Sequence, residues 1–259
     1  MPQNSTGEST EKPVMNKTKK SQLTRQNILQ SALILFRNEG YENTTIRDIA
    51  KKAKIALGTI YIYYASKEEI VLEYYTKKQN DLYRDIQNRF YGEPETVKNV
   101  SNKTTKARSM GLAESIKLLF ETQLKTLQPD KHFLSGLAGA AATAGSSVSP
   151  FSKSASDVRN IHIRMLEEIV ENSKDKIDPS VKKELPGLLW FLQMGIIFYW
   201  LHDTSKNSKY SLELVNTLTN ILESLIKLQN NPFASSFKKT FIELSKELMN
   251  IIKRDGIDR

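Results

Sequence analysis

Two short helical patterns separated by a turn lie within residues 45–64, and a longer helical pattern begins directly after them. The stretch 45–70 reads TIRDIAKKAKIALGTIYIYYASKEEI. Thr45 with Asp48 three residues later is a helix start of the capping-box type, and Ser66 with Glu69 predicts a similar start for the long helix, which extends to about residue 90. Helices this short bury little surface by themselves, so the exposed polar side of the second one needs a separate explanation.

Hydrophobic spacing predicts which residues of this region are buried. The chain becomes helical from Leu23, and Gly40 ends that first helix, with Tyr41 placed in the core. The helix expected at 57–64 buries Ile60 and Tyr64. The buried stripes of the two preceding helices comprise Ile28, Ala32, Leu35, Phe36, Ile46, Ile49, Ala50 and Ala53.

The outward side of the 57–64 helix carries hydroxyl groups and no acid. Thr59, Tyr61 and Tyr63 can reach a phosphate backbone, and the ammonium of Lys67 can meet a phosphate beside the first N–H groups of its helix. Arg47 can form a bidentate contact with guanine. These features favour insertion of the short helix into the major groove of DNA, whereas the simpler alternative is a helical hairpin without that role.

The stretch from residue 25 to residue 70 resembles the DNA-binding domain of the TetR family of transcriptional regulators. TIRDIAKKA is similar to the first helix of the family's helix-turn-helix motif, GTIYIYY to its recognition helix, and SKEEI to the start of the helix leading to the ligand domain. The resemblance covers about a fifth of the chain. It implies a DNA-binding regulator that acts as a homodimer.

The resemblance also implies roles for individual residues. Thr45 and Lys67 contact phosphates. Thr59, Tyr61 and Tyr63 lie on the DNA-facing side of the recognition helix. Arg47, Leu57 and Gly58 lie nearest the base edges. The chain departs from the family at Lys54, where a turn glycine is usual, and at Ala56, where a small hydroxyl residue usually caps the recognition helix. Each departure costs roughly 1 kcal/mol.

The rest of the chain is predicted to be helical. The expected segments are 109–127, 133–145, 156–174, 179–202, 211–229 and 235–253, with loops at 92–107 and 146–156. The fold class is therefore all-α: an N-terminal three-helix helix-turn-helix DNA-binding domain and a C-terminal helical bundle for ligand binding and dimerisation. We expect a disordered basic arm at 1–20, the DNA-binding domain at 21–68 and the bundle at 69–259.

Composition limits the partners and the compartment. The formal net charge of +9 favours a polyanion partner only weakly. Cysteine is absent, which excludes disulfides, thiolate catalysis and cysteine-ligated zinc. The apolar run at 188–200 is shorter than the ~20 residues of a membrane span and contains Gln193, and residues 1–20 lack a signal-peptide pattern. We expect a cytoplasmic protein with no membrane partner.

The C-terminal bundle is expected to form the dimer and to hold a ligand. Apolar residues at helical spacing form the predicted dimer face, or alternatively pack within one subunit: Leu212, Val215, Leu218, Ile221, Leu222, Leu225 and Ile226. Candidate pocket residues, which alternatively are ordinary core, are Phe120, Gln123, His132, Phe133, Met165, Trp190, Phe191, Met194, Phe198 and Tyr199. The small-residue run at 137–145 permits either close approach of another helix or a space beside its backbone, and a small apolar or aromatic ligand is predicted.

The sequence predicts neither catalysis nor a metal site. The histidines His132, His162 and His202 have no metal-ligand spacing, and no phosphate loop, nucleophile elbow or catalytic triad is present. We therefore expect no enzyme activity, no metal and no cofactor. The favoured function is a repressor released from double-stranded operator DNA by a ligand. The alternatives are a ligand-independent DNA-binding or architectural protein, and a helical interaction protein that binds no DNA.

Overall fold

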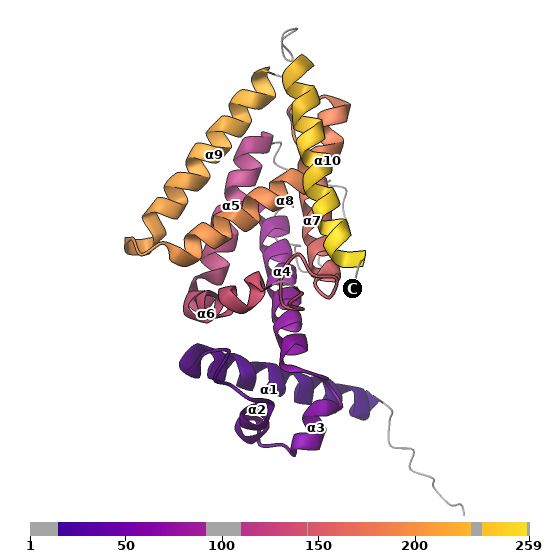
Figure 1. The fold of residues 1–259 in the computed structure, drawn as a ribbon, viewed down its shortest axis with the longest axis vertical. Helices are drawn as coiled ribbons and strands as arrows, with labels where there is room; N and C mark the ends of the chain where they lie inside the picture. Colours follow the sequence, from indigo (N-terminus) through magenta and orange to yellow (C-terminus); the bar gives the residue numbers. More distant parts are fainter. Residues whose placement is uncertain (1–14, 92–109, 144, 229–234, 258–259) are drawn as a thin grey trace, which may run out of the picture. The chain divides into compact units, whose positions relative to one another are not determined.

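The computed structural model describes residues 15–91, 110–143, 145–228 and 235–257, and across these ranges it contains helices and no strands (Figure 1). The all-α fold class is thereby confirmed. The chain divides into two compact units, Met1–Ile70 and Val71–Arg259. Helix α4 (Lys67–Tyr91) begins in the first unit and continues into the second. The predicted loop at 92–107 lies outside the described residues.

The first unit consists of α1 (Met15–Glu39), α2 (Ile46–Ala53), α3 (Leu57–Tyr61) and the start of α4. Helix α2 packs against both α1 and α3. Gly40 adopts φ +86° after α1, a left-handed conformation that glycine reaches without steric cost, and its N–H donates to Phe36 O. The core contains the predicted residues Ile28, Ala32, Leu35, Phe36, Tyr41, Ile49, Ala50, Ala53, Ile60 and Tyr64.

Two helix boundaries in this unit differ from the prediction. Helix α1 begins at Met15, so residues 15–20 of the expected disordered arm are helical, while residues 1–14 lie outside the described part. This segment, MNKTKK, contains no Gly or Pro and is rich in residues that favour helix. Helix α3 ends at Tyr61, because Ile62 and Tyr63 donate to carbonyls three residues back and tighten the chain into a turn.

The second unit is a helical bundle made of α4, α5 (Leu112–Leu127), α6 (Lys131–Ala142), α7 (Ser156–Glu171), α8 (Pro179–His202), α9 (Lys209–Leu228) and α10 (Ser235–Ile257). Helix α8 packs against α7 and α10, and α5 packs against α9 (Figure 1). The predicted loop at 146–156 is confirmed up to Ala155, because α7 begins at Ser156. Within this loop, Val148 is buried in the bundle core and the ring of Phe151 packs against Trp190.

Helix α8 is the apolar segment singled out from the sequence. By length and composition it is able to cross a membrane, a property that core helices of bundles share. Trp190, Gln193 and Trp200 of this helix are almost fully buried among the other helices. The indole N–H of Trp200 donates to Gln128 Oε1 at 3.2 Å. These contacts agree with the prediction of a buried bundle helix.

Candidate DNA-binding surface and ligand cavity

The turn between α2 and α3 is built around Lys54. This residue has φ 56° and ψ 45°. This is the left-handed conformation expected at a position where the family usually has a glycine. The backbone N–H of Lys54 donates to Lys51 O and that of Ile55 donates to Ala50 O, so both carbonyls at the end of α2 are hydrogen-bonded. From α1, the side-chain amide of Asn27 donates to Ala53 O at 2.8 Å and satisfies another terminal carbonyl. Asn27 was not identified from the sequence.

Helix α3 is held by two buried side chains at its rear. Ile60 is fully buried and Tyr64, just after the helix, is 1% exposed. Tyr64 stacks under the guanidinium of Arg25, 5.0 Å from the ring centre. Ala56 at the helix start provides no side-chain cap, as predicted. These contacts fix which side of α3 faces outward.

The outward side of α3 carries most of the residues proposed to contact DNA. Leu57, Gly58 and Tyr61 are exposed, and Thr59 and Tyr63 are half-buried. Ile62 is 78% exposed beside them, although the sequence analysis did not select it. An isoleucine this exposed offers a methyl surface suited to contact with a thymine methyl group or with sugar. Ile62 lies between Tyr61 and Tyr63, which the sequence analysis assigned to the DNA-facing side, and this position could have identified Ile62 from the sequence.

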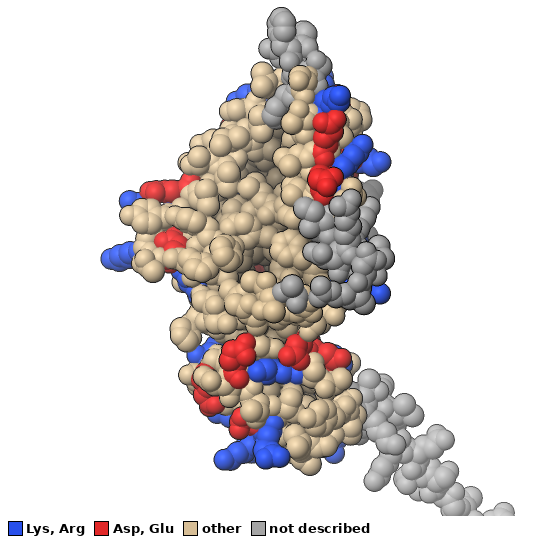
Figure 2. Space-filling view, in the orientation of Figure 1, with Lys and Arg blue, Asp and Glu red and all other residues tan. Residues whose placement is uncertain are grey.

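The start of α2 presents both a capping motif and a basic side chain. Thr45 and Asp48 form the predicted capping box: Thr45 N–H donates to Asp48 Oδ2 at 3.0 Å and Asp48 N–H donates to Thr45 Oγ1 at 3.2 Å. The hydrogen bonds from Thr45 lower the pKa of Asp48. Arg47 is exposed, and basic side chains gather at the end of the unit that carries α2 and the following turn (Figure 2).

Lys67 occupies a different environment from the one expected. Its ammonium donates to Tyr41 O at 2.7 Å and to Thr44 O at 3.0 Å, and it lies 4.0 Å from the centre of the Tyr41 ring. Two of its three N–H donors are therefore committed to the loop before α2. The ammonium positions this loop rather than pointing outward, so a phosphate contact at the start of α4 stays a prediction for the backbone N–H groups.

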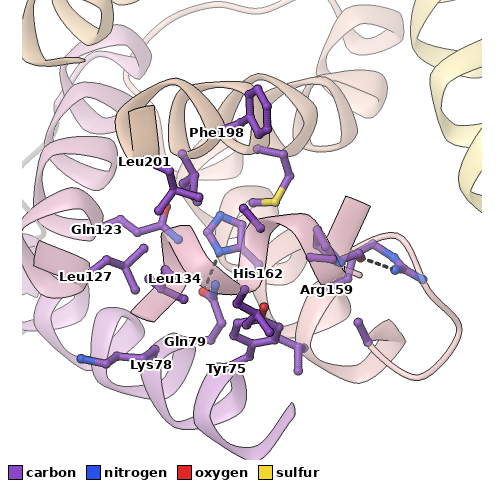
Figure 3. A pocket seen from close by; sticks show the side chains of 18 of the residues that line it. Tyr75, Lys78, Gln79, Gln123, Leu127, Leu134, Arg159, His162, Phe198 and Leu201 are labelled. Carbon is purple, nitrogen blue, oxygen red and sulfur yellow. Dashed lines mark hydrogen bonds between the residues drawn. The ribbon is translucent and has the colours of Figure 1, made fainter. Parts of the chain in front are cut away.

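The second unit contains a cavity of about 260 Å³ among α4, α5, α6, α7, α8 and the loop before α7 (Figure 3). Four of the predicted pocket residues line it, namely Gln123, Trp190, Met194 and Phe198. Phe120, Phe133 and Met165 do not line it and are each 1% exposed in the packed core. Of the other three candidates, His132, Phe191 and Tyr199, none lines the cavity. Aromatic residues at helical spacing do not reveal which of them face a space and which face each other.

The small residues of α6 contribute as the sequence suggested. Ala138, Ala141 and Ala142 line the cavity, and their short side chains leave room beside the helix backbone. The residues that sequence analysis missed lie mainly on α4 and α7. Tyr75, Gln79 and Leu82 recur at helical spacing on α4, and Arg159 and His162 lie one turn apart on α7. Such spacing shows that the residues share one face of a helix, but it does not show that a cavity lies against that face.

Two cationic side chains belong to the cavity wall and differ in their pairing. Lys78 forms an ion pair with the buried Asp130 at 2.8 Å and donates to Thr126 O, so its charge is already compensated. Arg159 donates to the carbonyls of Pro150 and Ser152, and within the described residues no carboxylate lies within 4 Å of it. Burial lowers the pKa of Arg159, which nevertheless stays protonated near neutral pH.

Comparison with known sequences gives matches in both units. Residues 28–74 match the family described as "Bacterial regulatory proteins, tetR family", and residues 115–248 match "Tetracyclin repressor-like, C-terminal domain". The HTH-type transcriptional regulator AcrR of Shigella flexneri is 35% identical over 85 residues, 31% of this chain and 40% of AcrR. The uncharacterized regulator YuxN of Bacillus subtilis is 44% identical over 54 residues, 19% of each protein. The chain thus aligns with less than half the length of either curated relative.

Solved structures agree in fold. FadR from Bacillus subtilis in complex with stearoyl-CoA has a TM-score of 0.50 at 17% identity, covering 73% of this chain and 96% of that one. FadR from Thermus thermophilus in complex with lauroyl-CoA has a TM-score of 0.52 at 20% identity, covering 75% and 92%. Because the C-terminal family match spans more than half of the chain and the N-terminal match covers the helix-turn-helix, the chain belongs to the TetR family of DNA-binding transcriptional regulators.

Proposed function

We propose that the protein is a repressor that binds operator DNA as a homodimer and is released when a small ligand enters the cavity of the second unit. The observation that carries this proposal is the cavity itself, because a DNA-binding protein that works without a ligand has no need of one. Its wall includes Tyr75, Gln79 and Leu82 of α4, the helix whose first residue, Lys67, braces the loop before α2. Ligand binding and DNA binding therefore share one helix.

The energy required of the ligand is modest. A ligand shifts the equilibrium between binding-competent and released forms only by its difference in affinity for them. A coupling free energy of about 1–3 kcal/mol changes DNA affinity roughly 5- to 150-fold, which is enough to alter promoter occupancy. A cavity lined mainly by apolar side chains supplies contacts of this size when an apolar molecule fills it.

The kind of ligand follows from size and surface. The cavity of about 260 Å³ lies just below the usual range of about 300–1,000 Å³ for ligand sites, so a compact molecule fits without rearrangement of the bundle. The FadR proteins of similar fold were solved with acyl-CoA molecules, which supports an apolar chain as the buried part of the ligand. Leu134, Leu137 and Ile197 add further apolar surface to the wall.

The proposed DNA contacts are divided between phosphates and bases. Thr45, Thr59, Tyr61, Tyr63 and the N–H groups at Lys67 are assigned to the backbone, and Arg47, Leu57 and Gly58 to base edges. Only Arg47 among the latter can make a bidentate hydrogen bond, so one subunit discriminates sequence weakly. Two subunits, with recognition helices about 34–36 Å apart, provide the specificity of an operator.

The test is selection of DNA fragments bound by the full chain from its source genome, followed by titration at several salt concentrations. We expect affinity to fall steeply with salt, and Tyr61→Phe, which removes one neutral hydrogen bond to phosphate, to weaken binding to all sequences without changing the log–log slope, because the slope counts only the phosphate charges that cationic side chains neutralise. Arg47→Ala is expected to relax the preference at one base pair. Lys125→Ala, an exposed change on α5, is expected to leave both the DNA affinity and the base preference unchanged. Binding that is insensitive to salt would contradict the proposal.

The repressor assignment has its own measurement. A reporter placed behind the selected operator is expected to rise when the chain is deleted and again when a cavity ligand is supplied to cells that express it. A reporter that falls on deletion would make the protein an activator. DNA affinity that no cavity-bound molecule changes would instead favour the ligand-independent alternative.

A further inference from the structure

Arg159 of α7 carries a positive charge in the cavity wall that no carboxylate of the described residues compensates. Of the described residues that line the cavity, none is Asp or Glu, and Lys78 is already paired with Asp130. The guanidinium of Arg159 packs against another wall residue, Trp190, with 5.9 Å between Cζ and the ring centre. An unpaired charge beside an apolar cavity favours a ligand that brings the opposite charge.

The hydrogen bonds of Arg159 leave one edge of its guanidinium unused. Nη1 donates to Pro150 O at 2.8 Å and to Ser152 O at 3.2 Å, which holds the side chain against the loop before α7. Nε and Nη2 form no hydrogen bond with the described residues. The edge that joins Nε and Nη2 presents two parallel N–H donors, and this arrangement matches the two oxygens of a carboxylate.

Tyr75 of α4 adds a hydroxyl group to the same wall. Its ring projects from α4 into the cavity (Figure 3), and its hydroxyl forms no hydrogen bond within the described part of the chain. Burial alone raises the pKa of Tyr75, so the hydroxyl keeps its proton and can donate it. The side chain nevertheless retains accessible surface, because part of it faces the cavity.

Helices α4 and α7 run in the same direction where they meet beside the cavity. Nδ1 of His162 lies 2.7 Å from Oε1 of Gln79 (Figure 3). Further along both helices, the hydroxyl of Tyr83 donates to the carboxylate of Glu168 at 2.9 Å. A later residue of α4 thus meets a later residue of α7, and this fixes the register of the two helices.

The same register places Tyr75 and Arg159 across from each other. Tyr75 precedes Gln79 by about one turn, and Arg159 precedes His162 by about one turn. We propose that Tyr75 and Arg159 form an anchor for the carboxylate of a compact apolar acid, whose body fills the apolar remainder of the cavity. The Nε–Nη2 edge of Arg159 binds the two carboxylate oxygens, and the hydroxyl of Tyr75 donates to one of them.

This anchor distinguishes a free acid from ligands of similar shape. Hydrogen bonds from these donors to a carboxylate are charge-assisted, and such bonds are roughly twice as strong as neutral ones. An amide or an alcohol leaves the charge of Arg159 uncompensated, an ammonium group is repelled by it, and a coenzyme A thioester has no charge at the end of its acyl chain. The inference rests on the proposed role of the cavity as a ligand site, and it names the chemical class of the ligand.

The experiment compares probes with one apolar body, each titrated calorimetrically at pH 7 into the full-length protein in the absence of DNA. The probes are octanoate, octanamide, octylamine and octanoyl-CoA. We expect octanoate to bind at least about tenfold more tightly than octanamide and octylamine, because only the carboxylate pairs with Arg159. Equal affinities for octanoate and octanamide, a preference for octylamine, or binding of octanoyl-CoA without binding of octanoate would overturn the proposal, as would binding of none of the probes.

Variants assign the preference to the two donors. Arg159→Gln and Tyr75→Phe should each weaken octanoate binding at least about fivefold and change octanamide binding less. The matched control is Lys153→Gln, which removes the same charge from an exposed position in the loop before α7 without changing the cavity wall, and it should leave octanoate binding unchanged. Octanoate affinity that falls equally in Lys153→Gln would indicate attraction by net charge alone and overturn the anchor.

Folding of each variant is verified by its melting temperature and far-UV circular dichroism. If Arg159→Gln fails to fold because the loop before α7 loses its hydrogen bonds, Arg159→Lys and Tyr75→Phe carry the test. Arg159→Lys keeps the charge and loses the parallel donors, so its octanoate affinity is expected to fall by less than that of Arg159→Gln. Unchanged octanoate affinity in both Arg159→Lys and Tyr75→Phe would overturn the assignment of these side chains.

The outcome is separable from that of the proposed function. A preference for octanoate in a protein that binds no DNA would leave the anchor in place and remove the proposed function. Salt-dependent DNA binding that a neutral ligand relieves, with equal affinities for octanoate and octanamide, would keep the proposed function and remove the anchor.

Discussion

Lys54 occupies a backbone conformation that only glycine adopts without cost. Its φ of 56° and ψ of 45° end α2 and start the turn into α3. For a residue with a Cβ atom this conformation costs about 1–2 kcal/mol. The chain tolerates the cost because Asn27 and the N–H groups of the turn satisfy the carbonyls at the end of α2.

We predict that Lys54→Gly stabilises the protein by about 1 kcal/mol, because it removes the steric conflict at positive φ. The matched change is Lys52→Gly, two residues earlier and inside α2, which should destabilise the protein by about 0.5–1 kcal/mol. Urea unfolding followed by circular dichroism measures both. If both substitutions have the same sign, the left-handed conformation of Lys54 does not determine the stability of the turn.

His162 links stability to pH. Burial lowers its pKa to about 4 from the ordinary 6.5, so the unfolded chain binds a proton that the folded chain does not. This contribution to stability is complete above pH 6.5 and is lost as the pH falls toward 4. We predict that His162 alone makes the protein about 2 kcal/mol less stable at pH 5 than at pH 7.

The control for this prediction is His162→Gln, which cannot titrate. Urea unfolding of both proteins at pH 7 and pH 5 gives the difference that belongs to His162, since other groups contribute equally to the two. A pH dependence that is unchanged in the variant would show that His162 is protonated in the folded protein.

At this scale the sequence was informative where a short local pattern determines the geometry. Thr45 and Asp48 form the predicted capping box, and Ile60 and Tyr64 are buried as their spacing indicated. Lys67 could not be assigned in this way, because the carbonyls that receive its ammonium come from residues more than 20 positions earlier. His162 was likewise undetectable as a cavity residue, because its partner Gln79 lies on another helix.

Among the helices, α8 shows how one position controls packing. A Cβ atom on Gly187 would lie 2.8 Å from Sδ of Met249 on α10, while one on Gly136 of α6 would meet no atom of the described residues within 4 Å. Alanine favours helix over glycine by about 1 kcal/mol in both helices. The two glycines therefore differ only in the contact that the added methyl group makes.

We predict that Gly136→Ala stabilises the protein by up to about 1 kcal/mol. Gly187→Ala is expected to destabilise it by about 1 kcal/mol, since the methyl group displaces Met249 and overpacks the contact with α10. Chemical denaturation measures both changes. The double variant Gly187→Ala with Met249→Ala should recover part of the loss, and its failure to do so would place the strain elsewhere.

The positions of the helices were predictable from their hydrophobic period, whereas their boundaries depended on the hydrogen bonds at the helix ends. Residues 179–202 were predicted as a helix and α8 has those limits, even with Pro186 inside it. Helix α3 came out shorter than the predicted 57–64, because the tyrosine-rich sequence continues the helical period while its hydrogen bonds tighten after Thr59. Hydrophobic periodicity shows which side of a helix is apolar, but it does not show where the last backbone hydrogen bond between residues i and i+4 forms.

For the molecule as a whole, α9 presents apolar residues on two sides. Val215 and Leu222 of the predicted dimer face are buried, together with the polar Thr219, so part of that face packs within the subunit. Leu212 and Ile221 remain 40% and 49% exposed, and Phe198 and Tyr199 of α8 are also exposed. In Figure 2 the surface over α8 and α9 carries few charged side chains. A face with apolar side chains and few charges suits a partner with the same surface.

We predict that Ile221→Glu converts a dimer into a monomer, because it replaces an exposed apolar side chain of this face with a charge. Light scattering after size-exclusion chromatography should give a mass of twice 29.5 kDa for the original protein and 29.5 kDa for the variant. Leu244→Glu, on α10 and 54% exposed, is the control and should stay dimeric. With the dimer lost, operator affinity is expected to fall at least about a hundredfold, since one recognition helix remains in place of two linked ones. A variant that is still dimeric would place the interface on another surface of the second unit.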